Sequence, residues 1–82
     1  MAVTMVAVES SNIEAIGRDG QQLYVRFKKG GVYSYGGVPD SVYDGLMAAP
    51  SKGQFFQHRI AYNKSYPFEK LSDEEATRRL AS

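Results

Sequence analysis

The chain has 82 residues, a net charge of +1 and no cysteine. This length predicts one domain with a single modest core. The near-neutral charge excludes a strongly basic nucleic-acid binder, so any such function needs a local patch. The lack of cysteine excludes a disulfide framework and a cysteine-ligated zinc site, and it fits the reducing cytoplasm, where we expect the protein. The apolar runs are too short to span a membrane, and the first residues lack the basic segment of a secretory signal.

The first half of the chain predicts antiparallel strands joined by tight turns. Asp19-Gly20 is a hairpin turn pattern, and a second glycine turn follows at Lys29-Gly30-Gly31. Between these turns, apolar and polar residues alternate, which is typical of a half-buried strand. The predicted strands are residues 4–8, 13–17, 23–28 and 32–35.

The register across the second turn decides which side chains share a face. A two-residue loop at Lys29-Gly30 places Arg26 opposite Tyr33 and Tyr24 opposite Tyr35. A three-residue loop would instead send both tyrosines to the core side. We expect the two-residue loop, because it keeps Val32 with the other aliphatic residues. One face would then carry Tyr24, Arg26, Lys28, Tyr33 and Tyr35.

Helices are predicted in the second half of the chain. Pro39-Asp40-Ser41 suits a helix start, and Pro50 ends that helix because its ring clashes with the preceding turn. Ser51 and Gln54 have the spacing of a capping box for the next helix, which runs to about residue 62. Ser72 begins a short C-terminal helix that must dock on the body or on another subunit.

The expected fold class is therefore α+β, with a small antiparallel β-meander of about three to four strands, two helices and a short C-terminal helix. Residues 1–71 form the domain, and residues 72–82 form the helical tail. The expected core residues are Leu23, Val25, Phe27, Leu46, Phe56 and Ile60.

A series of motifs resembles the KTSC domain, a small domain named for its place at the C-terminus of some lysyl-tRNA synthetases. The resemblance covers roughly residues 6–62 and implies RNA binding, because of the attachment to a tRNA enzyme. It also implies a domain that stands alone in bacteria and phages. Arg18 departs from the pattern, since an aromatic residue is usual after Ile-Gly. The motifs are Ser10-Ser11-Asn12-Ile13, Ile16-Gly17, the stretch from Phe27 to Tyr35 with its Tyr-x-Tyr, Val38-Pro39, and the stretch from Ala49 to Phe56.

The first candidate site is Ser51-Lys52-Gly53. A capped helix start offers free N–H groups to an anion, Lys52 adds a positive charge, and Gly53 allows close approach, so this segment could hold a phosphate. The alternative is structural: Ser51 only caps the helix, Lys52 is solvated, and Gly53 makes room for packing. The segment is not a Walker loop, because the Gly-x-x-x-x-Gly-Lys order is absent.

The second candidate site is the strand face that carries the three tyrosines with Arg26 and Lys28. Aromatic rings beside basic residues on a sheet can stack bases and hold phosphates. The alternative is that the tyrosines pack under the helices or the N-terminal strand. Ser10, Ser11 and Asn12 form either a simple turn or a polar rim beside the site.

The sequence points to no catalytic or metal site. His58 is the only histidine, and without cysteine a transition-metal site is improbable. We expect a non-enzymatic domain without a cofactor that binds a phosphate-bearing ligand, either RNA or a small or cyclic nucleotide. One alternative is a phage-type homo-oligomeric interaction module, joined through the C-terminal helix, that sequesters a nucleotide. A weaker alternative is a nucleotide hydrolase that uses His58.

Overall fold

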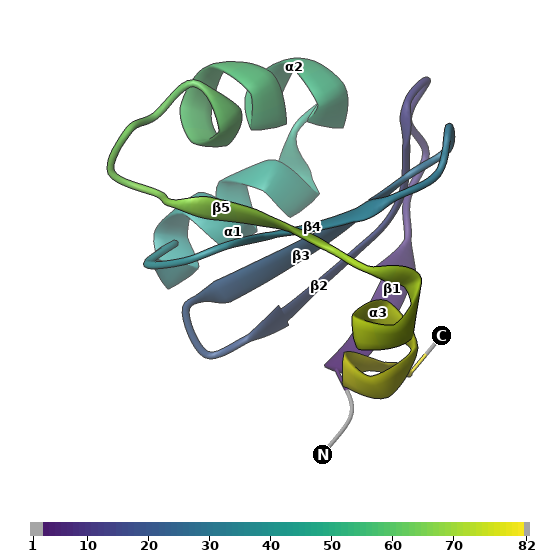
Figure 1. The fold of residues 1–82 in the computed structure, drawn as a ribbon. Coiled ribbons are helices and arrows are strands. Elements are labelled where there is room, and N and C mark those ends of the chain that lie inside the picture. Colours follow the sequence, from purple (N-terminus) through teal and green to yellow (C-terminus); the bar gives the residue numbers. More distant parts are fainter. Residues whose placement is uncertain (1–2, 82) are drawn as a thin grey trace.

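The computed structural model describes residues 3–81, which fold into a twisted sheet with helices on both faces (Figure 1). The sheet order is β5-β4-β3-β2-β1-β6; the first five strands in the chain pair antiparallel, and β6 pairs parallel with β1. The strands are β1 (Val3–Ala7), β2 (Ile13–Asp19), β3 (Gln22–Phe27), β4 (Val32–Tyr35), β5 (Phe68–Leu71) and β6 (Leu80–Ala81). The helices are α1 (Asp40–Ala48), α2 (Lys52–Phe56), the π-helical continuation η1 (Gln57–Ala61) and α3 (Asp73–Arg79).

The predicted α+β class is confirmed, and the number of strands is corrected. The antiparallel part has five strands rather than three to four, because β5 pairs with the outer side of β4. The sequence prediction assigned no strand to residues 68–71. Among residues 3–81, no helix combines the length and the apolar character needed to cross a membrane.

The main core lies between the sheet and the pair α1 and α2. Five of the six expected core residues are buried there, and Phe27 is only half-buried against them. The cluster comprises Ile13, Ile16, Leu23, Val25, Tyr35, Val38, Leu46, Phe56 and Ile60.

A second core lies on the opposite face of the sheet, where α3 packs (Figure 1). The C-terminal helix therefore docks on the sheet of its own chain. Ser72 caps α3 by accepting a hydrogen bond from the Glu75 N–H at 3.1 Å, as its spacing predicted. The cluster comprises Val3, Tyr24, Val32, Leu71 and Leu80.

The expected register across the β3–β4 turn is wrong by one residue. Tyr33 lies opposite Val25, and Tyr35 lies opposite Leu23. The Phe27 N–H donates to the Gly31 carbonyl at 3.1 Å, which closes a three-residue loop, and both Gly30 and Gly31 have the positive φ that such a loop demands. Both tyrosines therefore face α2. Val32 turns to the other face, where Leu71 and Leu80 give it apolar partners that the sequence prediction did not foresee.

Candidate functional site

A hollow of about 400 Å³ opens beside the β3–β4 hairpin on the face that α2 covers. We call it the hairpin pocket. It brings together three residues singled out from the sequence, because Asn12 meets Tyr33 and Tyr35 there. The lining residues are Asn12, Phe27, Lys29, Gly30, Tyr33 and Tyr35.

Aromatic rings form a continuous wall from the pocket to the edge of the sheet. Tyr33 meets Phe27 edge-on at a centroid distance of 5.6 Å, and its other neighbour is Phe68 of β5 at 6.2 Å. Phe68 also contacts Tyr35 at 6.0 Å. Phe68 is 65% exposed, whereas Tyr35 is 6% exposed. Tyr33 and Phe68 are thus the rings that a ligand can reach, and Tyr35 serves mainly as packing.

Two lysines flank these rings. Lys29 lines the pocket, and Lys70 lies opposite Tyr33 in the β4–β5 pairing. A Cβ built on Gly31 would lie 3.7 Å from both Lys70 Cε and Tyr33 Cε1, so the Lys70 side chain runs beside the tyrosine ring. The sequence prediction missed Lys29, Phe68 and Lys70 as site residues. The sequence Phe68-Glu69-Lys70-Leu71 does not alternate between apolar and polar residues, so only the pairing of β5 with β4 indicates the last two.

The environment of Tyr35 changes its acidity. Burial raises the pKa of the Tyr35 phenol above its ordinary value of 10.0, and the neighbouring Tyr33 adds to the rise. Tyr35 therefore keeps its proton at neutral pH. It contacts Phe56 edge-on at 5.2 Å, which ties the pocket wall to the main core.

The turn before β2 connects the hairpin to the start of α2. Ser10 Oγ donates to Asn12 Oδ1 at 3.1 Å and accepts from the Ile13 N–H at 3.3 Å. The Asn12 carbonyl accepts from the Lys28 N–H at 2.9 Å. A Cβ on Gly53 would lie 2.7 Å from Asn12 Oδ1, so this turn is pressed against α2. The structure thus joins Ser10, Asn12 and Gly53, while Ser11 lies exposed beside them.

Each residue of the predicted phosphate segment has a structural role. Ser51 Oγ accepts from the Gln54 N–H at 3.4 Å and so caps α2. The Lys52 ammonium donates to the Ala49 carbonyl at 3.2 Å, at the end of α1. Gly53 makes room for Asn12. The cap at Ser51 and the space at Gly53 match the structural alternative described above, whereas Lys52 is hydrogen-bonded rather than only solvated. Phosphate binding at Ser51, Lys52 and Gly53 stays a prediction.

The other strand-face residues lie on the opposite side of the sheet, so the predicted five-residue face is wrong. Tyr24 is buried under α3, and Arg26 and Lys28 line a separate cavity there. The one-residue change of register separates them from Tyr33 and Tyr35.

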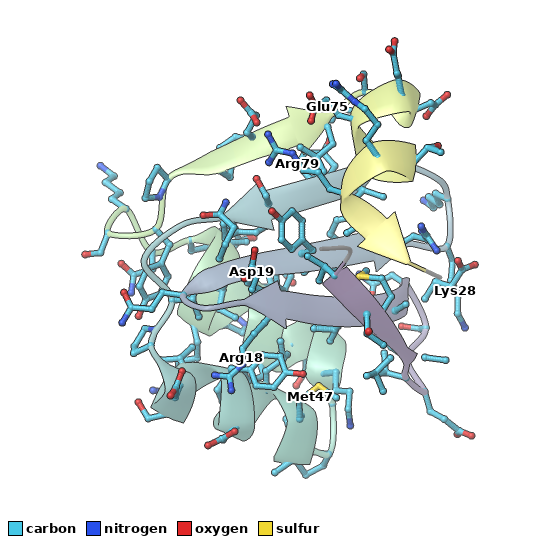
Figure 2. The ribbon with its side chains drawn as sticks, turned by 90° about the horizontal axis from the view of Figure 1, so that it is seen from below. Arg18, Asp19, Lys28, Met47, Glu75 and Arg79 are labelled. Carbon is cyan, nitrogen blue, oxygen red and sulfur yellow. The ribbon has the colours of Figure 1, made fainter. Side chains whose placement is uncertain are left out.

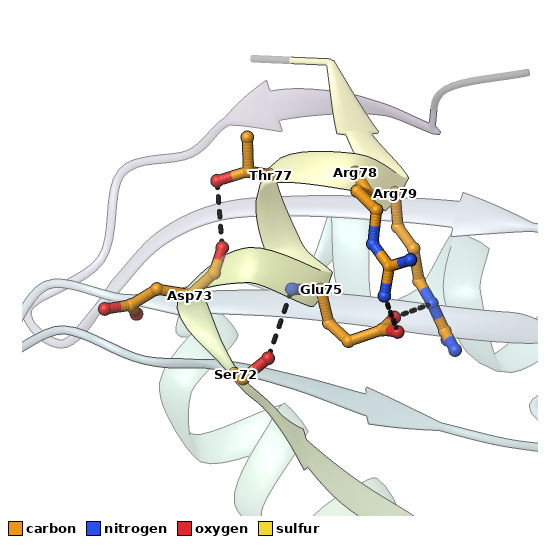
Figure 3. A network of polar contacts seen from close by, with 6 residues as sticks. All are labelled: Ser72, Asp73, Glu75, Thr77, Arg78 and Arg79. Carbon is orange, nitrogen blue, oxygen red and sulfur yellow. Dashed lines mark hydrogen bonds and ion pairs between the residues drawn. The ribbon is translucent and has the colours of Figure 1, made fainter.

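Figure 2 shows how α3 presents its charged residues over this side of the sheet. Glu75 binds both Arg78 and Arg79, with the Arg79 Nε to Glu75 Oε2 distance at 2.7 Å (Figure 3). A hydrogen bond to the Tyr24 side chain, and then the Glu75 charge, raise the pKa of the Arg79 guanidinium. Glu75 thus holds both arginines on the last turn of α3.

Arg18, the departure from the family pattern, links the sheet to α1. Its guanidinium pairs with Asp40 and lies 4.8 Å from the centre of the Tyr43 ring. These contacts explain a charged residue at this position without any ligand.

His58 lies exposed on η1, with its ring 5.9 Å from that of Tyr62. It borders a hollow of about 340 Å³ with Ser51, Gln54 and Arg59, and the described residues that line this hollow include no carboxylate. Over residues 3–81, no group of three potential metal-binding side chains gathers.

Comparisons with known proteins agree with the motifs. The KTSC domain model matches residues 9–66. A protein of Tsukamurella paurometabola is 51% identical over 53 residues, which are 62% of this chain and 79% of that protein. A lysine–tRNA ligase of Nostoc punctiforme is 46% identical over 52 residues, 63% of this chain but only 9% of the ligase.

The fold also matches a solved structure. A KTSC domain protein from Yersinia pestis superimposes with a TM-score of 0.78 at 34% sequence identity, covering 87% of this chain and 100% of that one. The family model covers well over half of the chain. This chain belongs to the KTSC domain family.

Proposed function

We propose that this domain binds single-stranded RNA, or a short nucleotide segment, at the hairpin pocket and carries out no chemistry on it. One observation carries the proposal: two accessible rings, Tyr33 and Phe68, lie side by side at 6.2 Å, and Lys70 lies opposite Tyr33 while Lys29 lines the pocket. In proteins that bind single-stranded nucleic acid, aromatic rings stack on the bases and neighbouring basic side chains bind the phosphates.

The two parts of the site would contribute differently. Base stacking on Phe68 or Tyr33 is worth about 1–3 kcal/mol per base and depends little on salt. Lys29 and Lys70 would neutralise phosphates, and this contribution falls as salt rises because fewer counterions are released. The Asn12 amide adds a polar group at the pocket rim.

The similarity to the Nostoc punctiforme lysine–tRNA ligase supports an RNA ligand, because that enzyme acts on a tRNA. Lys29 and Tyr33 lie inside the family match, whereas Phe68 and Lys70 lie just beyond residue 66.

The test is a titration of the folded protein with single-stranded RNA, cyclic dinucleotides and mononucleotides at low and moderate salt. Phe68→Ala should weaken RNA binding with an unchanged salt slope, and Lys70→Gln should weaken it with a flatter slope. Arg78→Gln is the matched control, because Arg78 lies on α3 across the sheet. If the wild-type protein binds none of these ligands at high micromolar concentration, the proposal is wrong. Equal effects of Lys70→Gln and Arg78→Gln would place any binding elsewhere.

A further inference from the structure

A second and larger cavity, of about 470 Å³, lies between α3 and the end of the β3–β4 hairpin. It is on the opposite face of the sheet from the hairpin pocket, and we call it the α3 cavity. Its volume falls within the range of roughly 300–1,000 Å³ that small-molecule sites occupy. Its apolar wall consists of Val32, Leu71 and Leu80, which are all buried.

Four charged side chains surround this apolar wall. Arg26 and Lys28 come from the end of β3, Glu14 comes from the β-bulge between Ile13 and Ala15, and Asp73 opens α3. Bulges commonly redirect a side chain toward a site. The rim therefore carries two positive and two negative groups.

None of these four charges is neutralised by an ion pair within the described part of the chain, residues 3–81. The neighbouring cations of α3 are occupied, because Arg78 and Arg79 both bind Glu75. Figure 3 shows the Asp73 carboxylate pointing away from that network. Both signs of charge thus remain available beside an apolar surface.

We propose that the α3 cavity binds a small zwitterion with an aliphatic side chain, such as a free apolar amino acid. The ligand carboxylate would bind Arg26 and Lys28, its ammonium group would bind Asp73 and Glu14, and its side chain would pack on Val32, Leu71 and Leu80. An uncharged apolar ligand would desolvate four charges without compensating them. A simple anion would satisfy the two basic residues and leave the two acidic ones without a partner.

The first test is a ¹⁵N-HSQC titration of the full chain with leucine, leucine methyl ester, N-acetyl-leucine and inorganic phosphate. We expect leucine to shift amide signals of residues 26–32 and 71–80, and the ester, the acetylated compound and phosphate to bind more weakly by about tenfold or more. No leucine shifts up to about 10 mM, where millimolar affinity would be visible, would overturn the proposal. Equal binding of leucine and its two blocked derivatives would also overturn it.

Substitutions test which cavity residues bind the carboxylate of the ligand and which bind its ammonium group. Arg26→Gln and Asp73→Asn should each lower leucine affinity by about tenfold, and Arg59→Gln, on the other face of the sheet, should leave it unchanged. Asp73→Asn should also reduce the ratio of the affinities for leucine and N-acetyl-leucine, because only Glu14 then remains to bind the ammonium group. A purely structural role of Asp73 in α3 would leave this ratio unchanged and would contradict the assignment. RNA binding at the hairpin pocket is measured separately, so either proposal can fail alone.

Discussion

Asn12 occupies the space that any side chain at position 53 would need, because a Cβ on Gly53 would lie 2.7 Å from Asn12 Oδ1 and 3.6 Å from Ser10 Oγ. Asn12 also lines the hairpin pocket. Gly53 at the start of α2 therefore leaves room for the turn before β2. The contact between Gly53 and Asn12 sets the position of Asn12 in the hairpin pocket.

Gly53→Ala should push Asn12 out of its place and weaken RNA binding, with the free energy of unfolding within about 1 kcal/mol of wild type. The steric loss is offset by the gain of roughly 0.5–1 kcal/mol that alanine brings to a helix. In an Asn12→Ala background, the same change should stabilise the protein by that amount. Urea unfolding of the wild type, the two single variants and the double variant measures the coupling energy between positions 12 and 53. If Gly53→Ala has the same effect in both backgrounds, the two residues do not interact as described.

Phe56→Ala should lower the free energy of unfolding by about 3–5 kcal/mol, because it leaves a cavity in the main core. Phe56 is buried and touches the rings of Phe27 and Tyr35 at 5.7 and 5.2 Å. Phe68→Ala, which removes an exposed ring, should change the free energy of unfolding by less than about 1 kcal/mol. Guanidinium unfolding followed by circular dichroism compares the two. Similar losses in both variants would show that Phe56 does not anchor the core.

Leu80→Ala should destabilise the protein by about 2–5 kcal/mol, because Leu80 is buried with Val3 and Tyr24 where the chain returns to the sheet. Arg78→Ala is its control. It removes only an exposed ion pair with Glu75, a pair of the kind worth about 1 kcal/mol or less. Thermal unfolding of both variants measures the difference. Equal melting temperatures would show that the C-terminal segment does not hold the second core together.

The same segment tests the homo-oligomer hypothesis. We expect removal of residues 72–82 to expose Tyr24, Val32 and Leu71, and hence to lower stability without lowering the apparent mass in light scattering. The reason is that α3 covers the sheet of its own chain. A mass that falls from two or more chains to one on truncation would instead make this helix an interface between copies.

The sequence was sufficient to predict the fold class. It was insufficient to predict which face of the sheet the side chains of β4 occupy. Alternation over residues 23–28 placed Leu23 and Val25 in the core, where the structure has them. The glycines after Lys29, however, permit a two-residue or a three-residue loop with equal ease. Packing against distant parts of the chain decides between them: Tyr33 and Tyr35 contact Phe68 on one face, and Val32 lies with Leu71 and Leu80 on the other.

The candidate site was predictable only in part, for the same reason. Asn12, Tyr33 and Tyr35 were identified from the chain, and the structure brings them to one pocket. Phe68 and Lys70 were not, because a four-residue strand after Pro67 has little intrinsic preference and forms by pairing with β4. Long-range strand pairing is what completes the site.

Alkaline pH should destabilise the protein through the buried Tyr35 phenol. Burial first, and Tyr33 second, raise the pKa of Tyr35 above 10.0, so the folded state holds this proton more tightly than the unfolded state. The stabilisation is therefore fully present below pH 10.0 and is lost as pH rises through the folded-state pKa.

Tyr35→Phe removes the ionisable group. Its free energy of unfolding should run parallel to wild type at lower pH and fall less steeply at higher pH. Tyr62→Phe, at a residue that is 65% exposed, should follow the wild-type curve. Urea unfolding between neutral pH and strongly alkaline pH measures all three proteins, and a Tyr35→Phe curve as steep as wild type would show that Tyr35 is not the group whose ionisation opens the core.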